Sequence, residues 1–204
     1  MKILPLLFKA VRKIKNLGFG KIYTPYAILK FILNDVAFGY SVQVRGRMRI
    51  FVTKRGVFSI GNGTKFNSGP AFNVSGGAQR MTFWVDGKLE IGNNVGMSSS
   101  AILCKHHIVI GDNVTVGGNT LIIDSDSHSI NANVRIDRDK DRHGARWGKI
   151  IICDNVFIGT RSTILKGVTI GKDSVVGACS VVTKSIPENE IWGGNPAKFI
   201  KKVQ

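Results

Sequence analysis

The chain has few cysteines, few acidic residues and no long apolar run. Its three cysteines, Cys104, Cys153 and Cys179, are odd in number and lack a CxxC spacing. That pattern speaks against paired disulfides and a structural zinc site, and it fits a reducing cytosol. No run reaches about 18 apolar residues, so we expect no membrane-spanning helix. The apolar stretch 3–8 contains Pro5 and precedes several basic residues, so we expect no secretory signal either.

Acidic residues are scarce, because 13 Asp and Glu oppose 29 Lys and Arg in 204 residues, a formal charge of +16. Such an excess favours anionic partners: nucleic acid, a phosphate-bearing cofactor, an acidic polymer or an anionic membrane surface. We see no zinc-finger spacing, RNP-like segment or recognition-helix pattern, so nucleic acid is not expected. Prolines are also few, at 5, whereas the 24 glycines predict many tight turns.

A six-residue period runs through residues 152–186. Every sixth residue is aliphatic, and a small or β-branched residue follows four positions later. The aliphatic positions are Ile152, Ile158, Ile164, Ile170, Val176 and Val182. A period of six fits neither a helix nor a flat sheet, but it fits a short strand, a turn and a repeat. Positions i and i+4 of an extended segment share one face, which we expect to be a dry interior.

The same rhythm extends toward the N-terminus with interruptions. It begins at Ile60, Phe66 and Phe72, slips over 73–90, resumes at Ile91, and breaks for a long insertion at 124–149. Three hexads make one turn of a three-sided coil. About five to six coils, each rising about 4.8 Å, would form a prism about 25–30 Å long. Stacked coils satisfy one another's backbone groups, so only the two ends need covers.

The two ends of the chain differ from the repeats. Residues 1–40 carry seven basic residues and one acid, with apolar positions at helical spacing near 6–14. Two interpretations stay open: attachment to the cytoplasmic membrane face, where each basic residue adds roughly 1 kcal/mol, or a helix packed on the end of the prism. We predict a basic N-terminal cap at 1–50, a β-helix at 51–186 and a C-terminal tail at 187–204.

The hexads, the segment DSDSHS at 124–129 and the tail IWGGNPAKFIKK at 191–202 closely resemble the hexapeptide-repeat acyltransferases. The most similar branch is the bacterial sugar O-acetyltransferases of surface-polysaccharide synthesis. The resemblance covers roughly 60–202. It implies an all-β solenoid, the left-handed parallel β-helix, with a homotrimeric assembly and acetyl-CoA as donor. Left-handedness would be an exception to the usual crossover rule, and the period alone indicates only a coil.

His128, at the start of the insertion, is the candidate general base. Asp126 or Asp124 could accept a hydrogen bond from one ring nitrogen and leave the other as an acceptor. His128 would then take the proton of a sugar hydroxyl, whose oxygen attacks the thioester while backbone N–H groups stabilise the oxyanion. The position matches the family's catalytic histidine. The alternative is a surface-loop histidine without a role.

His106 and His107 raise a second possibility. With His128 they number three, and some prisms of this kind bind zinc through three histidines and hydrate carbon dioxide. Neighbouring residues on a strand point to opposite faces, however, so the spacing suits co-ligation poorly and we expect no metal. His107 could instead approach a substrate from an adjacent subunit, or lie on the surface.

The resemblance also suggests where coenzyme A binds, in a groove between subunits. The matching positions are Gly159 and Thr160, then Gly177 and Ala178 one coil later, where small residues allow close approach to the backbone. Thr183, Lys184 and Lys198 match the region that meets the nucleotide, where a lysine can pair with the 3′-phosphate. The alternatives are turn glycines and solvated lysines.

Three tryptophans could be sugar platforms or packing residues. We assign Trp192 to packing and keep both interpretations for Trp84 and Trp147. The loop 124–148 carries five basic and five acidic residues, so we do not expect a simple polyanion clamp there.

These observations predict an O-acetyltransferase that moves an acetyl group from acetyl-CoA to a sugar hydroxyl in O-antigen, capsule or exopolysaccharide synthesis. The alternatives are a small soluble acceptor, a sugar amine, or a catalytically silent β-helix scaffold. We expect a homotrimer with sites between subunits and a sugar or glycolipid acceptor. The expected location is the cytoplasm, or the inner membrane face with peripheral contact through residues 1–40.

Overall fold

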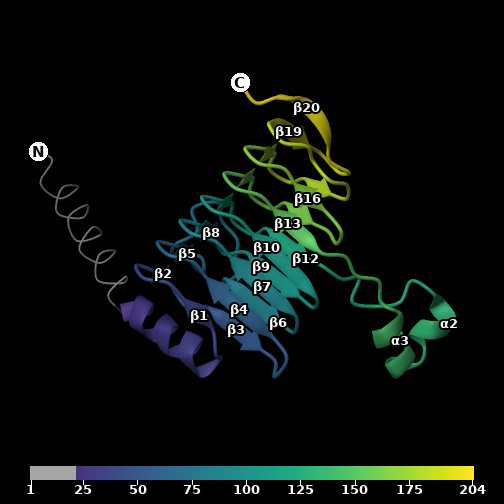
Figure 1. The fold of residues 1–204 in the computed structure, drawn as a ribbon, viewed down its shortest axis with the longest axis horizontal. Helices are drawn as coiled ribbons and strands as arrows, with labels where there is room; N and C mark the ends of the chain where they lie inside the picture. Colours follow the sequence, from purple (N-terminus) through teal and green to yellow (C-terminus); the bar gives the residue numbers. More distant parts are fainter. Residues whose placement is uncertain (1–21) are drawn as a thin grey trace, which may run out of the picture.

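The computed structural model describes residues 22–204, which form a three-sided coil of parallel strands (Figure 1). Sheet A contains β1 (Ala37–Phe38), β4 (Val57–Ile60), β7 (Lys88–Ile91), β10 (His107–Ile110), β13 (Ile150–Ile152) and β16 (Thr169–Ile170). Sheet B contains β2 (Gln43–Arg45), β5 (Lys65–Asn67), β8 (Gly96–Ser98), β11 (Thr115–Val116), β14 (Phe157–Ile158), β17 (Val175–Val176), β19 (Glu190–Gly193) and β20 (Lys198–Lys202). Sheet C contains β3 (Arg49–Val52), β6 (Thr82–Val85), β9 (Ala101–Cys104), β12 (Leu121–Ile123), β15 (Thr163–Ile164) and β18 (Val181–Val182).

The hexad residues form the core, as the period predicts. In sheet A, Ile110 pairs with Ile152 and Ile152 with Ile170. In sheet B, Ile158 pairs with Val176. All of these side chains are buried. Each apolar side chain therefore stacks on its equivalent one coil away, and the interior is a continuous apolar column with a dispersion contact at every level.

Between residues 67 and 91 the six-residue repeat differs from the prediction. Phe72 does not occupy a core position; it lies in the loop between β5 and β6 and makes an edge contact with Tyr23, the ring centroids being 5.9 Å apart. The core positions after the loop are taken by Phe83, Val85 and Leu89, all fully buried. The loop absorbs the extra residues, which is why the period slips in the sequence.

One corner of the coil, between sheets A and B, uses left-handed backbone. Asn94, Asn113, Asn155 and Asp173 all have φ between 55° and 60°, a region that asparagine and aspartate tolerate better than other non-glycine residues. Their side chains form a ladder, because the amide of Asn94 donates to Asn113 (3.3 Å), that of Asn113 to Asn155 (3.1 Å) and that of Asn155 to Asp173 (2.7 Å). The ladder holds the same turn at the same place in successive coils.

The N-terminal end of the coil is covered by a helix at residues 22–33. Its Ala27 and Phe31 are buried in the core, the Thr24 hydroxyl accepts from the N–H of Val44 (3.0 Å), and Lys30 Nζ donates to the carbonyl of Met48 (3.0 Å). This part of the N-terminal segment is therefore a packed cap. Strands β1, β2 and β3 already belong to the sheets, so the coil starts before the predicted boundary at residue 50. The basic helix expected near residues 6–14 lies outside the described residues.

The C-terminal tail covers the other end. Strand β19 pairs in parallel with β17, and β20 folds back antiparallel on β19. Trp192 packs against the core while its indole N–H donates to Glu190 (2.8 Å), as expected for a packing residue. No helix among residues 22–204 is long and apolar enough to cross a membrane.

The insertion leaves the coil between β12 and β13, at the corner between sheets C and A. It contains α2 (Ala132–Arg135) and α3 (Arg138–Gly144). Asn131 caps α2 and Asp137 caps α3 through side-chain bonds to backbone N–H groups of the first turn. Figure 1 shows this pair of helices standing away from the coil. The insertion is thus a projecting arm on an otherwise regular prism.

We predict that Leu89→Ala in β7 lowers the free energy of unfolding by about 2–5 kcal/mol, because it opens a cavity in a fully buried column. The matched control is Lys88→Ala on the outer face of the same strand, which loses a surface ion pair with Glu90 and costs at most about 1 kcal/mol. Denaturant unfolding at one fixed protein concentration gives both values. Equal losses would contradict the assignment of the two faces.

Candidate functional site

The imidazole of His128 is held by a carboxylate of the projecting arm. His128 Nδ1 lies 2.7 Å from Asp141 Oδ2, and the N–H of Ser129 donates to Asp141 Oδ1 at 2.6 Å. The hydrogen bond with His128, followed by that from Ser129, lowers the pKa of Asp141, so the carboxylate is ionised at neutral pH. Nδ1–H then donates to Asp141 and leaves Nε2 as the acceptor. The His128 side chain is 69% exposed, so Nε2 can meet a substrate.

The carboxylates expected to orient His128 have other partners, so that expectation was wrong. Asp124 is fully buried and accepts from the backbone N–H groups of Lys105, His106 and His107, each at 2.8 Å. Asp126 forms an ion pair with Lys166. Asp124 thereby fixes the turn between β9 and β10, and Asp126 ties the arm to the coil. Both carboxylates anchor the structure beside the histidine without touching its ring.

Asp141 was missed because it lies 13 residues after His128 in a segment without a repeat. The available signal was its place four residues after Asp137, an N-cap residue that starts α3. A helix beginning there turns residue 141 to the same face as the cap. That signal fixes a helical face but does not say what the face contacts.

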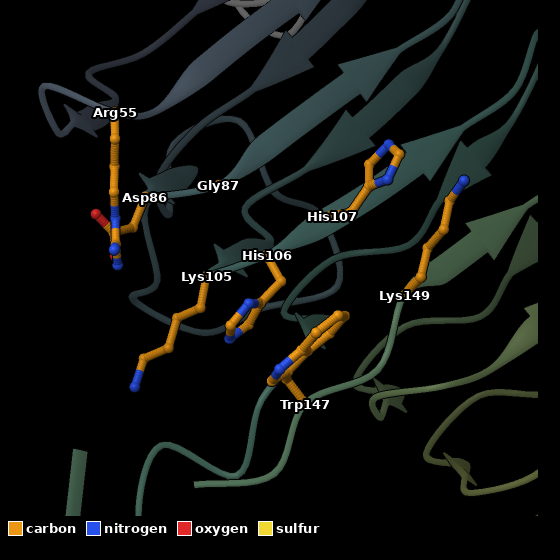
Figure 2. Close-up of a pocket in the computed structure, with 8 residues that line it drawn as sticks. All are labelled: Arg55, Asp86, Gly87, Lys105, His106, His107, Trp147 and Lys149. Carbon is orange, nitrogen blue, oxygen red and sulfur yellow. The ribbon is translucent and has the colours of Figure 1, made fainter. Parts of the chain in front are cut away.

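Two adjoining cavities lie at the corner between sheets C and A, under the base of the arm. One, of about 530 Å³, is lined by the residues labelled in Figure 2: Arg55, Asp86, Gly87, Lys105, His106, His107, Trp147 and Lys149. The other, of about 750 Å³, shares Arg55, Asp86, Lys105, His106 and Trp147 and adds Trp84, Ser125, Arg142, His143 and Ala145. Together they bring residues of four coil turns to the base of the insertion.

Of the tryptophans left open by the sequence, Trp147 lines both cavities. Its indole stacks on His106, with centroids 4.3 Å apart and planes 12° apart, yet the residue remains 58% exposed. Trp84 stacks on Phe51 at 6.3 Å and lines the larger cavity. Both therefore pack on a neighbouring ring and still present surface to a cavity.

His106 and His107 point apart, as expected, but His106 lies in the turn before β10 and only His107 is on the strand (Figure 2). His106 faces Trp147, whereas His107 Nε2 contacts Glu90 Oε2 at 2.8 Å. Lys88 and then His107 lower the pKa of Glu90 by hydrogen bonding. Within the described part of the chain, no group of three histidine, cysteine or carboxylate side chains is close enough to hold a metal ion.

A groove of about 440 Å³ follows the opposite corner of sheet C, where it meets sheet B. It contains four residues expected to meet the donor, Gly159, Thr160, Gly177 and Ala178. Its other lining residues come from the loop 73–75 and from neighbouring coils: Asn73, Val74, Ser75, Ser98, Gly117, Gly118, Phe157, Val175 and Val176. The other expected donor residues, Thr183, Lys184 and Lys198, are exposed and lie outside it.

Coil stacking explains some of the groove's glycines. A Cβ on Gly159 would come within 2.5 Å of the backbone nitrogen of Ala178, and one on Gly117 within 2.5 Å of that of Thr160. These positions must be glycine for successive coils to approach. A Cβ on Gly177 would meet nothing closer than 3.5 Å, so coil contact does not demand glycine there.

Known protein families and sequences contain the same repeats as this coil. Residues 149–184 match the family model described as bacterial transferase hexapeptide (six repeats). A putative acetyltransferase of Saccharomyces cerevisiae is 39% identical over 111 residues, 48% of this chain and 57% of that protein. A galactoside O-acetyltransferase of Lactococcus lactis is 36% identical over 103 residues, 50% of this chain and 44% of that protein. The chain thus spans about half the length of the curated relatives it matches.

Among solved structures, an N-acyltransferase from Bacillus cereus, in complex with dTDP-4-amino-4,6-dideoxyglucose and coenzyme A, is similar with a TM-score of 0.69. The likeness covers 88% of this chain and 89% of that one at 22% identity, so it speaks to the fold. The matched repeats, the related sequences and the shared architecture lead to one conclusion. Residues 149–184 carry hexapeptide repeats of the bacterial transferase type, and the fold is the left-handed parallel β-helix.

Proposed function

We propose that this protein transfers an acetyl group from acetyl-CoA to a hydroxyl group of a sugar, with His128 as the general base. The observation that carries the proposal is the pairing of an exposed imidazole with Asp141, which leaves Nε2 free to accept a proton. A surface-loop histidine without a role would not need a carboxylate held by a second hydrogen bond.

The proposed reaction is a direct transfer. Nε2 of His128 takes the hydroxyl proton as the sugar oxygen attacks the thioester carbonyl. The new ester bond forms, the carbon–sulfur bond breaks, and the imidazolium returns the proton to the departing thiolate, giving free coenzyme A. Asp141 acts as a positioning residue, because it orients the ring and stabilises its charged form.

We assign the donor to the groove between sheets B and C. A pantetheine arm is long, narrow and rich in amide groups, and the small residues Gly177 and Ala178 leave backbone within its reach. Lys198 pairs with Gly193, which lies next to Gly177 at the C-terminal end of the groove, so its exposed side chain could meet the nucleotide. Thr183 and Lys184 follow β18 on the opposite edge of sheet C, so within a trimer they would meet the nucleotide bound by a neighbouring copy. A lysine there would pair with its 3′-phosphate.

A complete site would need two copies of the chain. The arm with His128 leaves the corner between sheets C and A, whereas the groove follows the corner between sheets B and C. The whole of sheet C separates them within one chain. In a homotrimer with threefold symmetry, one subunit's arm can reach over the groove of the next, which we propose as the arrangement.

For the acceptor, we favour a sugar or glycolipid of surface-polysaccharide synthesis. The L. lactis relative is a galactoside O-acetyltransferase, which supports a sugar hydroxyl. The B. cereus structure contains an amino sugar, so a sugar amine is the second candidate, since the same base would serve both. We place Trp147, Trp84 and His107 on the acceptor side because they line the cavities beside the arm.

We further propose peripheral contact with the cytoplasmic membrane face through the basic segment within residues 1–40, which carries seven lysines and arginines. Deleting residues 1–20 should then abolish binding to vesicles containing anionic lipid at low salt, and high salt should weaken binding of the intact chain. Co-sedimentation measures both. If the truncated chain sediments as the intact one does, this segment is not the membrane contact.

His128→Ala should reduce acetyl-CoA-dependent acetylation of a sugar acceptor by about 10²–10⁴-fold, since removal of a general base typically costs that much. Coenzyme A should still bind with its original affinity, because the residues that line the groove are unchanged. Release of free thiol measures turnover, and calorimetry measures binding. The matched control is Asn133→Ala, an exposed residue in the same arm, which should keep full activity. Equal rates for His128→Ala and the parent would contradict the assignment and favour the scaffold interpretation.

Ala178→Phe should raise the KM for acetyl-CoA by at least about tenfold, because a ring in the groove blocks the donor's path. Residue 178 is exposed at a corner, so the fold should tolerate the change. Lys172→Phe places the same ring at the exposed corner between sheets A and B of the same coil and serves as the control. An unchanged KM for Ala178→Phe would place the donor elsewhere.

A further inference from the structure

The two cavities under the arm are positively charged, although the loop above them has equal numbers of acidic and basic residues. The loop 124–148 has as many acidic as basic residues, but four of its five carboxylates have other partners: Asp124 binds backbone N–H groups, Asp126 binds Lys166, Asp137 binds Lys140 and Asp141 binds His128. None of these carboxylates lines the cavities, whereas Arg142 of the loop does, beside Arg55, Lys105 and Lys149. The cavity walls therefore carry a net positive charge.

We propose that these cavities bind the negatively charged part of the acceptor, a phosphate or carboxylate attached to the sugar. The link to catalysis rests on the proposed function, whereas the binding site is inferred from the residues that line the cavities. Arg55, Lys105, Arg142 and Lys149 line the cavities, and Asp86 is their one lining carboxylate. Four cations against one acid form a local field that favours an anion.

Asp86 does not cancel this field. Arg55 binds it directly and Thr53 Oγ1 donates to it at 2.6 Å. The hydrogen bond with Arg55 is the largest cause of its lowered pKa, so Arg55 and Asp86 together are nearly neutral. Lys105, Arg142 and Lys149 form no ion pair within residues 22–204. A tetrahedral or planar oxyanion could take hydrogen bonds from these three side chains.

The walls also offer a surface for the sugar ring. Trp147 stacks on His106 with one face, at 4.3 Å between centroids, and stays more than half exposed. Its backbone is fixed by a bridge to Ser125, and its ring lies beside His106 among the residues that line the cavity (Figure 2). An aromatic face beside cations suits a ligand with an apolar sugar face and an attached anion.

The cavities also border the proposed base. Lys105 Nζ reaches the carbonyl of Ser127 at 3.5 Å, one residue before His128, and Arg142 follows Asp141, the residue that holds the His128 ring. An anion bound between Lys105 and Arg142 would bring the attached sugar next to the imidazole. The positive charge would thus select an anionic acceptor and fix the position of its sugar beside His128.

Calorimetry tests the inference without requiring turnover, so a failure of His128 as base would not affect it. Three probes are titrated into the full chain in the presence of coenzyme A, which fills the proposed phosphate sites of the donor groove. The probes are pyrophosphate for a diphosphate-linked sugar, glucuronate for an acidic sugar, and methyl glucoside as the neutral reference. Each is repeated with Lys105→Gln/Arg142→Gln and with Lys65→Gln/Lys172→Gln, which removes the same charge from exposed sites elsewhere.

We expect pyrophosphate, glucuronate or both to bind, and the Lys105→Gln/Arg142→Gln variant to weaken that binding at least about tenfold. The control pair should bind as the parent does, and methyl glucoside should not respond to either pair. The anion that binds more tightly identifies the source of the charge. Absence of binding by both anions, or equal losses in the two variants, would overturn the site.

Discussion

The stacking of one coil on the next is the constraint on which the rest of this structure depends. Ile110, Ile152 and Ile170 repeat the same inward position at successive levels, and the backbone of each coil finds its hydrogen-bond partners in its neighbours. Close approach then requires glycine at Gly117 and Gly159 and left-handed asparagines at another corner. With the interior filled and the backbone paired, only corners, outer faces and interruptions remain for chemistry.

The insertion shows how function is built on such a rigid frame. Its carboxylates first fasten it: Asp124 binds the turn beneath it and Asp126 pairs with Lys166. Asp141 then orients His128, and Arg142 of the arm lines the cavities together with Arg55, Lys105 and Lys149. One exposed imidazole and a positively charged wall result from the same distribution of partners. The groove on the other edge of sheet C has a simpler origin, because the packing of successive coils already requires glycine at Gly117 and Gly159.

The sequence predicts the regular part of this molecule far better than the irregular part. A period of six fixes which residues of 152–186 point inward, because each hexad faces the same constraint as the one before it. Phe72 was wrongly assigned to the core, because the loop between β5 and β6 contains extra residues that nothing in its composition reveals. Asp141 could not be identified as the partner of His128, because the path of the arm depends on contacts between residues distant in sequence. Gly159 could be placed at a corner, but only the close approach of Ala178 shows why it is glycine.

Mixed trimers test most directly the central claim that arm and groove from different copies form one site. His128→Ala subunits, with an intact groove, are coexpressed with equal amounts of Ala178→Phe subunits, with an intact arm, and acetyl transfer is measured at limiting acetyl-CoA. Random assembly pairs a sound arm with a sound groove at about one quarter of the interfaces. We predict that the mixture regains about that share of the parent's activity, while each variant alone remains impaired. Activity no higher than the average of the two unmixed variants would show that arm and groove of the same chain act together.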